Sequence, residues 1–321
     1  MSARMGARMW PRLSGTAAEL GFGLGWKLIA RLPEQSAQAL FARLADRAHS
    51  RRGPSIRQLE RNLLRVCPQL TQLELTELSR EAMRSDLRYY CEAFRLPTYS
   101  PAEIEARNVV AGSEVLFNAV NSGRGTIVSM PHSGNWDLLG AWAVGRGVPF
   151  TTVVERLKPD GLYRRFVEFR ESIGMEVLPL TGGAEPVFDT LADRLRAGGT
   201  VCLLGDRDIS RSGVRVGFFG ETARMPAGPA ALAIDTGANL LSGWQWYQPD
   251  GPNGTTRLHT QLVGPIEPAA GSSRARRIIA TTQLLADQYA TGIAEHPADW
   301  HMLQPLWLAD LDPRRAAGGS E

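Results

Sequence analysis

A histidine and an aspartate stand five residues apart in the segment SMPHSGNWDLLGAW, residues 129 to 142. His132 follows the β-rich run TIVSM and precedes an apolar helical pattern that begins near Asn135. We therefore expect it in the crevice at the carboxyl ends of the strands, where open α/β sheets bind ligands. Asp137 is close enough to turn back and orient the imidazole, which would leave the other ring nitrogen free to take a proton. The alternative is a turn histidine followed by a carboxylate that the helix dipole favours.

Common catalytic motifs are missing from the sequence. It has no GxSxG nucleophile elbow, no Walker A loop, no HExxH and no GxGxxG after a strand. Its three cysteines show neither CxxC nor Cys/His metal spacing, which predicts no disulfide framework, no metal site and a reducing compartment. Acid–base chemistry without a covalent intermediate remains as the predicted kind of catalysis.

Two patterns of apolar residues divide the chain. Up to about residue 98 they recur at helical spacing, as in Leu75, Leu78, Ala82, Met83, Leu87, Tyr90, Cys91 and Phe94. Further on, helical patterns alternate with short β-rich runs at 126–130, 150–154, 175–178, 200–204 and 239–247. We predict an α/β fold with a mixed, partly parallel sheet flanked by helices. The expected division is a helical layer over 1–98, a core over 99–312 and a disordered tail over 313–321.

The positive charge is concentrated at the start of the chain. Residues 1–66 carry twelve Arg and Lys against four Asp and Glu, an excess of +8 in a chain whose net charge is only +3. Aromatic and leucine side chains are interleaved with this charge, and no uncharged run approaches the roughly 18 to 20 residues of a spanning helix. We expect this layer to lie on an anionic membrane surface. Nucleic-acid binding and a merely solvated helix face are the alternatives.

Four blocks of the sequence carry a resemblance to a known family. They are PHSGNWD, VVERLKPDGLYRRFVEFRESIGMEVLPL, GDRDISRSGVRVGFFGETARMPAGPAALA and HPADWHMLQPLW, in this order. The first resembles the His-x4-Asp/Glu signature of the glycerolipid acyltransferase superfamily. Together the blocks resemble the branch that contains the bacterial lipid A late acyltransferases and the actinobacterial phosphatidylinositol mannoside acyltransferases. The likeness covers nearly the whole chain from about residue 20.

This resemblance implies an activity and a set of catalytic residues. His132 would be the general base that activates an acceptor hydroxyl for attack on the thioester of acyl-CoA, with no acyl-enzyme. Asp137 would orient the base, and a second acid is carried over to Asp206, with Asp208 as the alternative. The implied acceptor is a mannose hydroxyl of a glycosylated phosphatidylinositol. Acyl-CoA would be a co-substrate, and no cofactor, metal or nucleic acid is expected. The implied location is peripheral, on the cytoplasmic face of the plasma membrane.

Five further residues are candidates for binding substrate. Arginines are natural partners of the CoA phosphates, and Arg170 borders the apolar stripe of a predicted helix, where it would anchor a ligand or hold Glu155. Arg207 and Ser212 lie in the third block, and the turn around Ser212 would offer hydroxyl and N–H donors. Asp235, one helix further on, is the fifth candidate.

Several features keep alternatives open. Trp244, Trp246, Trp300 and Trp307 would line an acyl tunnel or, as we favour, pack in the core; His301 is assigned a structural role. Rival functions are acylation of lipid A or another glycolipid, and non-catalytic binding of acyl lipids. A histidine base such as His132 at the mouth of the pocket argues against the non-catalytic binding protein, because a carrier needs no base. Acyl length, the sugar hydroxyl and the oligomeric state are not fixed by any motif.

Overall fold

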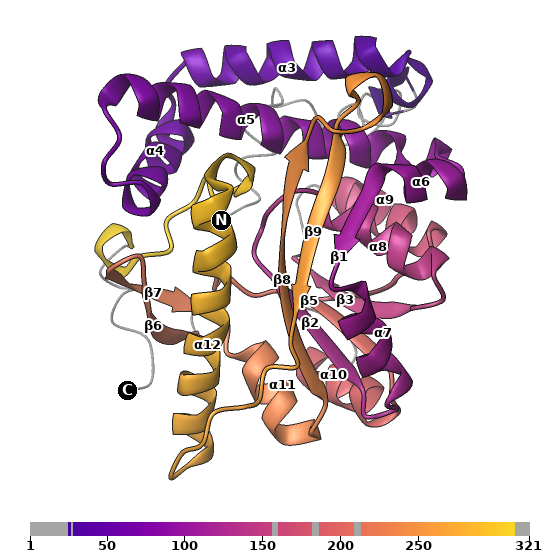
Figure 1. Cartoon of the computed structure of the whole chain (residues 1–321), viewed down its shortest axis with the longest axis vertical. Helices are drawn as coiled ribbons and strands as arrows, with labels where there is room; N and C mark the ends of the chain where they lie inside the picture. Colours follow the sequence, from indigo (N-terminus) through magenta and orange to yellow (C-terminus); the bar gives the residue numbers. More distant parts are fainter. Residues whose placement is uncertain (1–24, 27, 156–159, 182–185, 209–212, 312–321) are drawn as a thin grey trace.

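The computed structural model describes residues 25–26, 28–155, 160–181, 186–208 and 213–311. Within these ranges a seven-stranded sheet runs in the order β1-β9-β8-β2-β5-β3-β4 (Figure 1). All neighbouring strands are parallel except the antiparallel pair β8 and β9, and β6 with β7 forms a separate antiparallel hairpin. The strands are β1 (Asn108–Ala111), β2 (Thr126–Met130), β3 (Phe150–Val154), β4 (Glu176–Pro179), β5 (Thr200–Leu204), β6 (Val214–Phe218), β7 (Glu221–Met225), β8 (Asn239–Gln248) and β9 (Arg257–Val263).

Helices cover both faces of this sheet. Side chains alternate along a strand, so Val128 and Met130 of β2 point into one apolar core whereas Ile127 points into the other. The first core includes side chains of α3 (Glu34–Ser50), α4 (Pro54–Val66), α5 (Gln72–Arg95), α7 (Ser113–Asn121), α8 (Trp136–Gly145) and α9 (Asp160–Ser172). The second includes α10 (Val187–Arg196), α11 (Gly228–Thr236) and α12 (Arg274–Glu295).

The predicted fold class is confirmed, because the sheet is mixed, mostly parallel and flanked by helices. The five predicted β-rich runs correspond to β2, β3, β4, β5 and β8, with β4 and β8 shifted or extended by one residue. Strands β1 and β9 and the β6–β7 hairpin were not predicted. Strand β1 has only four residues and follows the helix α6 (Pro101–Arg107) directly, so no turn residue separates the two patterns.

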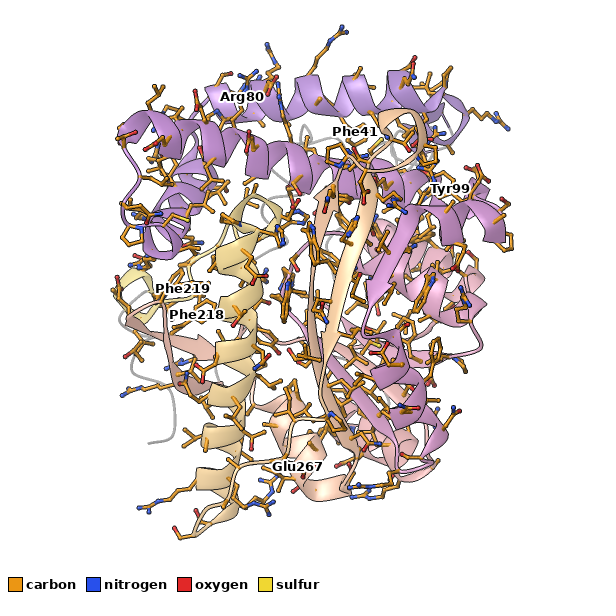
Figure 2. All side chains as sticks on the ribbon, viewed as in Figure 1. Phe41, Arg80, Tyr99, Phe218, Phe219 and Glu267 are labelled. Carbon is orange, nitrogen blue, oxygen red and sulfur yellow. The ribbon has the colours of Figure 1, made fainter. Side chains whose placement is uncertain are left out.

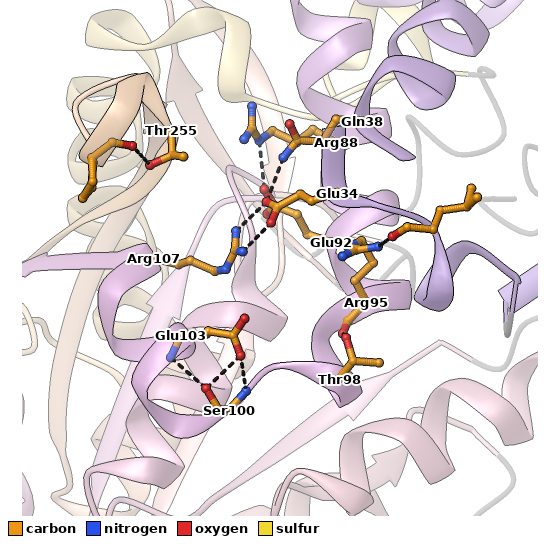
Figure 3. A network of polar contacts seen from close by, with 12 residues as sticks. Glu34, Gln38, Arg88, Glu92, Arg95, Thr98, Ser100, Glu103, Arg107 and Thr255 are labelled. Carbon is orange, nitrogen blue, oxygen red and sulfur yellow. Dashed lines mark hydrogen bonds and ion pairs between the residues drawn. The ribbon is translucent and has the colours of Figure 1, made fainter. Parts of the chain in front are cut away.

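Helices α3 and α5 pack side by side across one end of the molecule (Figure 1). Phe41 of α3 is buried in the first core, whereas Arg80 of α5 lies outside and binds Asp46 (Figure 2). Figure 3 shows how α6 is tied to this layer, since Arg107 donates two hydrogen bonds to Glu34 of α3, at 2.7 and 2.6 Å. This layer therefore has an apolar face toward the sheet and a charged outer face.

Two predicted segments lie outside the described residues: the basic start of the chain up to residue 24, and the tail over 313–321. How the chain divides into domains stays a prediction. In the described ranges, none of the helices has both the length and the apolar character that crossing a bilayer requires.

Candidate active site

His132 lies in a tight turn between β2 and α8. Gly134 in this turn has φ +58°, and a Cβ there would come within 2.5 Å of the Gln245 Cβ, so a side chain is excluded both by conformation and by space. Asn135 caps α8 by accepting a hydrogen bond from the N–H of Leu138 at 3.0 Å. The turn that contains His132 therefore has a defined conformation between the end of β2 and the start of α8.

The register of the sheet brings His132 to Asp206. Strands β2 and β5 are parallel neighbours, and Met130 at the end of β2 pairs with Leu204 at the end of β5. His132 and Asp206 each stand two residues beyond these paired positions. Both residues therefore leave the sheet side by side at its carboxyl edge, where α/β folds usually bind their ligands.

The two side chains form a hydrogen-bonded pair. His132 Nδ1 lies 2.5 Å from Asp206 Oδ1, and the backbone N–H of His132 donates to Oδ2 at 3.0 Å. The indole Nε1 of Trp300 donates a third hydrogen bond to Oδ2, at 2.9 Å. The Asp206 carboxylate is fully buried, while about a quarter of the His132 side chain is accessible, 23%.

The charge of Asp206 decides which imidazole nitrogen is basic. Burial by itself raises the pKa of Asp206, but the interactions with His132 and Trp300 outweigh it, so the pKa lies below the ordinary value. An ionised carboxylate only accepts hydrogen bonds. His132 Nδ1 must therefore carry a hydrogen toward Asp206, which leaves the lone pair on Nε2. The pair is a histidine base held in one tautomer.

The expectation that Asp137 orients His132 is wrong. Asp137 lies in the first turn of α8 and points toward α5 and α9, where its carboxylate accepts hydrogen bonds from Arg170 at 2.6 and 3.1 Å and from the Tyr89 hydroxyl at 2.9 Å. The reason is that α8 packs against those helices in the first core, while His132 turns to the end of β5. Asp206 takes the orienting position instead.

Arg170 thus holds Asp137 and not Glu155. Only 12% of the Arg170 side chain and 1% of the Asp137 side chain are exposed. Burial alone lowers the pKa of Arg170, but the interactions with Asp137 and Tyr89 raise it above the ordinary value. The pair is buried and bidentate, and both residues line the cavity described below, as His132 does.

Breaking this pair should cost stability. We expect Asp137→Ala to lower the free energy of unfolding by about 3–5 kcal/mol, because it leaves the Arg170 guanidinium buried without a countercharge. The control is Glu105→Ala, which removes the partner of Arg146 from a pair whose side chains are about half exposed, and which should cost about 1 kcal/mol or less. Urea unfolding of both variants measures the difference. Equal losses would contradict a structural role for the buried pair.

The remaining candidates near β5 occupy different positions. Arg207 donates to Glu155 and to Gln304, each at 3.3 Å. Asp208, the alternative second acid, accepts a hydrogen bond from the backbone N–H of Gly213 at 3.1 Å. The structure therefore brings Asp206, and not Asp208, to the imidazole of His132.

Two candidates do not join the site. Ser212 lies outside the described residues. Asp235 is on α11, where Arg274 donates to its carboxylate at 2.7 Å, and it does not line the cavity described below. The assignment of Asp235 to the site is not supported by its position: it faces α12, away from the carboxyl ends of the strands.

Two neighbours of the pair were not among the predicted site residues. Trp300 is buried in the core, as favoured, but its indole also holds Asp206. His301 donates its backbone N–H to the carbonyl of His132 at 2.8 Å, and burial lowers the pKa of its imidazole to about 3. The signal that could have found both is their place in the block HPADWHMLQPLW, one of the four ordered blocks.

A cavity of about 900 Å³ adjoins the pair. His132, Arg170, Arg207 and Asp208 are among its polar lining residues. Most other lining residues are apolar, and many come from the first core and the N-terminal layer, among them Phe41, Leu87, Phe94, Leu139 and Phe166. A large, mostly apolar cavity lined by a few polar groups suits a long-chain lipid. No cluster of three potential metal-ligating side chains occurs among the described residues.

An oriented histidine base beside a large apolar cavity, on an α/β sheet, suits an enzyme that acts on lipids. The chain belongs to the bacterial lipid A biosynthesis acyltransferase family, which matches residues 14–309.

Two relatives are similar along almost their whole length. The phosphatidylinositol mannoside acyltransferase of Mycolicibacterium smegmatis is 47% identical over 309 residues, covering 96% of this chain and 97% of that protein. The phosphatidylinositol mannoside acyltransferase of Mycobacterium tuberculosis H37Rv is 43% identical over 304 residues, covering 94% and 92%.

Proposed function

We propose that this protein transfers a long-chain acyl group from acyl-CoA to a mannose hydroxyl of a phosphatidylinositol mannoside. The names and the extensive identity of the two relatives support the acceptor. The observation that carries the chemistry is the His132–Asp206 pair in the wall of a large apolar cavity. The apolar part of the cavity would hold the acyl chain and place its thioester near His132.

In the proposed step, His132 Nε2 takes the proton of the acceptor hydroxyl as its oxygen attacks the thioester carbonyl. The carbon–oxygen bond forms, the carbon–sulfur bond breaks, and the CoA thiolate leaves with the proton that the imidazole returns. Asp206 keeps the imidazole in the required tautomer and stabilises the imidazolium that forms. No acyl-enzyme is involved, and the proximity of the two bound substrates supplies the rest of the acceleration.

Arg170 and Arg207 line the cavity. We propose that they favour the negatively charged CoA part of the donor by their positive field, in addition to holding Asp137 and Glu155. This differs from a direct clamp, because both guanidinium groups already bind carboxylates of the protein.

An acceptor panel tests the function. The purified protein is incubated with radiolabelled acyl-CoA and, separately, with phosphatidylinositol mannosides, lipid A precursors and other glycolipids. We expect the label in phosphatidylinositol mannoside and one free CoA for each ester formed. Label found only in lipid A would mean that lipid A, and not the mannoside, is the acceptor. Binding of acyl-CoA without any transfer would favour the non-catalytic acyl-lipid binding protein.

We further propose that the N-terminal layer attaches the protein to the cytoplasmic face of the plasma membrane. Exposed leucines support this, because most of those in the described residues lie in this layer: Leu28, Leu40, Leu44, Leu64 and Leu73, against Leu284 elsewhere. Together with the +8 excess over residues 1–66, they would give an apolar and an electrostatic contribution to binding.

Sedimentation with vesicles measures both contributions. Binding to anionic vesicles should fall, without vanishing, as salt shortens the roughly 8–10 Å screening length, and should fall further when Arg4, Arg8 and Arg12 are changed to Glu. Leu64→Ser, at a side chain that is 42% exposed and does not line the cavity, should weaken the salt-insensitive part, whereas Leu284→Ser, at 39% exposure, should not. Equal binding to neutral vesicles at low salt, or strong binding to duplex DNA, would contradict the membrane proposal.

A further inference from the structure

Helix α5 places an unpaired carboxyl group in the wall of the cavity. Asp86 is only 7% exposed and lines the cavity, yet no side chain or N–H of the described residues donates a hydrogen bond to it or forms an ion pair with it. Burial alone raises the pKa of this carboxyl to about 7. The carboxyl oxygens remain accessible from the cavity, since they are not among the fully enclosed side-chain oxygens that lack a partner, so a group bound in the cavity can reach them.

The neighbouring polar groups on the same helix are paired within the protein. The Ser85 hydroxyl donates to Asp299 at 2.5 Å, and the Tyr89 hydroxyl donates to Asp137 at 2.9 Å. Glu92 accepts hydrogen bonds from three other side chains. The absence of a hydrogen-bond partner for Asp86 among the described residues therefore reflects its position at the cavity and is not shared by the whole helix.

Tyr90 stands one helical turn after Asp86 and also lines the cavity. Its hydroxyl makes no hydrogen bond with any residue in the described part of the chain. Burial raises the pKa of Tyr90 and so does Asp86, while the charges of Arg170 and Arg207 lower it. Tyr90, Asp86 and His132 all line the same cavity.

We propose that the Asp86 carboxyl and the Tyr90 hydroxyl bind hydroxyl groups of a polyol acceptor and hold its sugar ring near His132. The inference rests on the proposed function and adds to it a site that selects the acceptor. Side chains four residues apart on a helix have Cβ atoms about 5–6 Å from each other, which suits two hydroxyls of one ring. The ionised Asp86 carboxyl only accepts hydrogen bonds, its protonated form also donates one, and the phenol both donates and accepts.

Other parts of the substrates fit this pair less well. A phosphate would be repelled by the carboxylate, and an acyl chain offers no hydrogen for it to accept. The amide groups of acyl-CoA do carry N–H donors, so a role on the donor side is the competing assignment. The two assignments differ in which substrate loses affinity when Asp86 is removed.

The test measures binding and transfer separately in the full chain. The binding probe is the soluble, deacylated head group of a phosphatidylinositol mannoside, followed by saturation-transfer NMR or calorimetry. Asp86→Ala should weaken its binding about 10- to 100-fold, as expected for a hydrogen bond to a charged group, and Tyr90→Phe about 3- to 10-fold. In acyl transfer the KM of the acceptor should rise and that of acyl-CoA should not. Glu77→Ala, on the exposed face of α5, is the matched control without effect.

Stability provides the second readout. Because the buried carboxyl has no partner among the described residues, Asp86→Ala should melt at a temperature at least as high as the wild type, whereas a structural residue would melt lower. Head-group binding that is absent in the wild type, or equal in wild type and Asp86→Ala, would overturn the inference, as would a rise in the KM of acyl-CoA instead. A wild type that binds the head group but transfers no acyl group would refute the proposed function and leave this site standing.

Discussion

His132→Ala should abolish measurable acyl transfer while the protein stays folded. General-base catalysis contributes typically about 10² to 10⁴ in rate, and alanine leaves no group that could take the proton of the acceptor. The side chain is partly exposed and makes one hydrogen bond, to Asp206, so its loss should affect the transition state more than the packing. Transfer rates are compared at equal concentrations of folded protein.

Binding of acyl-CoA supplies the control for this variant. His132→Ala keeps the apolar cavity, so its affinity for acyl-CoA should stay within a few-fold of the wild type. Near-normal transfer by the variant would end the proposed mechanism. Loss of both transfer and acyl-CoA affinity would instead indicate that the variant had changed the cavity.

Asp206→Asn should have the second-largest effect. An amide can donate to His132 Nδ1, which places the imidazole hydrogen on Nε2 and removes the basic lone pair from the acceptor side. We therefore expect a loss in turnover approaching that of His132→Ala, with little change in the KM of either substrate. Asp208→Asn is the control two residues along, since Asp208 binds the backbone of Gly213 and not the imidazole.

The outcome of this pair of variants decides between the two acids. Normal turnover in Asp206→Asn together with a sharp loss in Asp208→Asn would move the assignment by two residues. Trp300→Phe should fall in between, because it removes one of the donors to Asp206 but keeps an aromatic ring in the core.

The same carboxylate predicts a dependence of stability on pH. The pKa of Asp206 is lower in the folded protein than its ordinary value, so its contribution to stability is present above the ordinary pKa of aspartate. That contribution is lost as the pH falls through the lowered pKa. Asp206→Asn should therefore be less sensitive to acid than the wild type over that range, as measured by urea unfolding at a series of pH values.

Much of the fold was predictable because it depends on local patterns. The runs that became β2 and β5 alternate with helical patterns, and the position of His132 after a strand indicated the carboxyl edge of the sheet. The partner of His132 was not predictable in this way. It depends on β2 and β5 being neighbours in register, and sequence separation along the chain says nothing about which strands pair.

Asp137 and Trp300 show that distance along the sequence does not predict which side chains contact the site. Asp137 is near His132 in sequence, but the packing of α8 against α5 and α9 directs it to Arg170. Trp300 is 168 residues from His132, yet the fold brings its indole to the same carboxylate. The cavity likewise is assembled from helices and strands that are far apart in the sequence, so only some of its polar lining residues could be anticipated from a motif.

A single-turnover experiment tests direct acyl transfer most sharply. The protein is loaded with acyl-CoA, mixed with phosphatidylinositol mannoside and quenched at intervals, and the protein, the lipid and free CoA are all analysed by mass spectrometry. We predict that the acylated lipid and free CoA appear together and that the mass of the protein never increases. A protein species carrying the acyl group before the lipid is acylated, or release of CoA with no new ester on the mannoside, would contradict direct transfer assisted by His132.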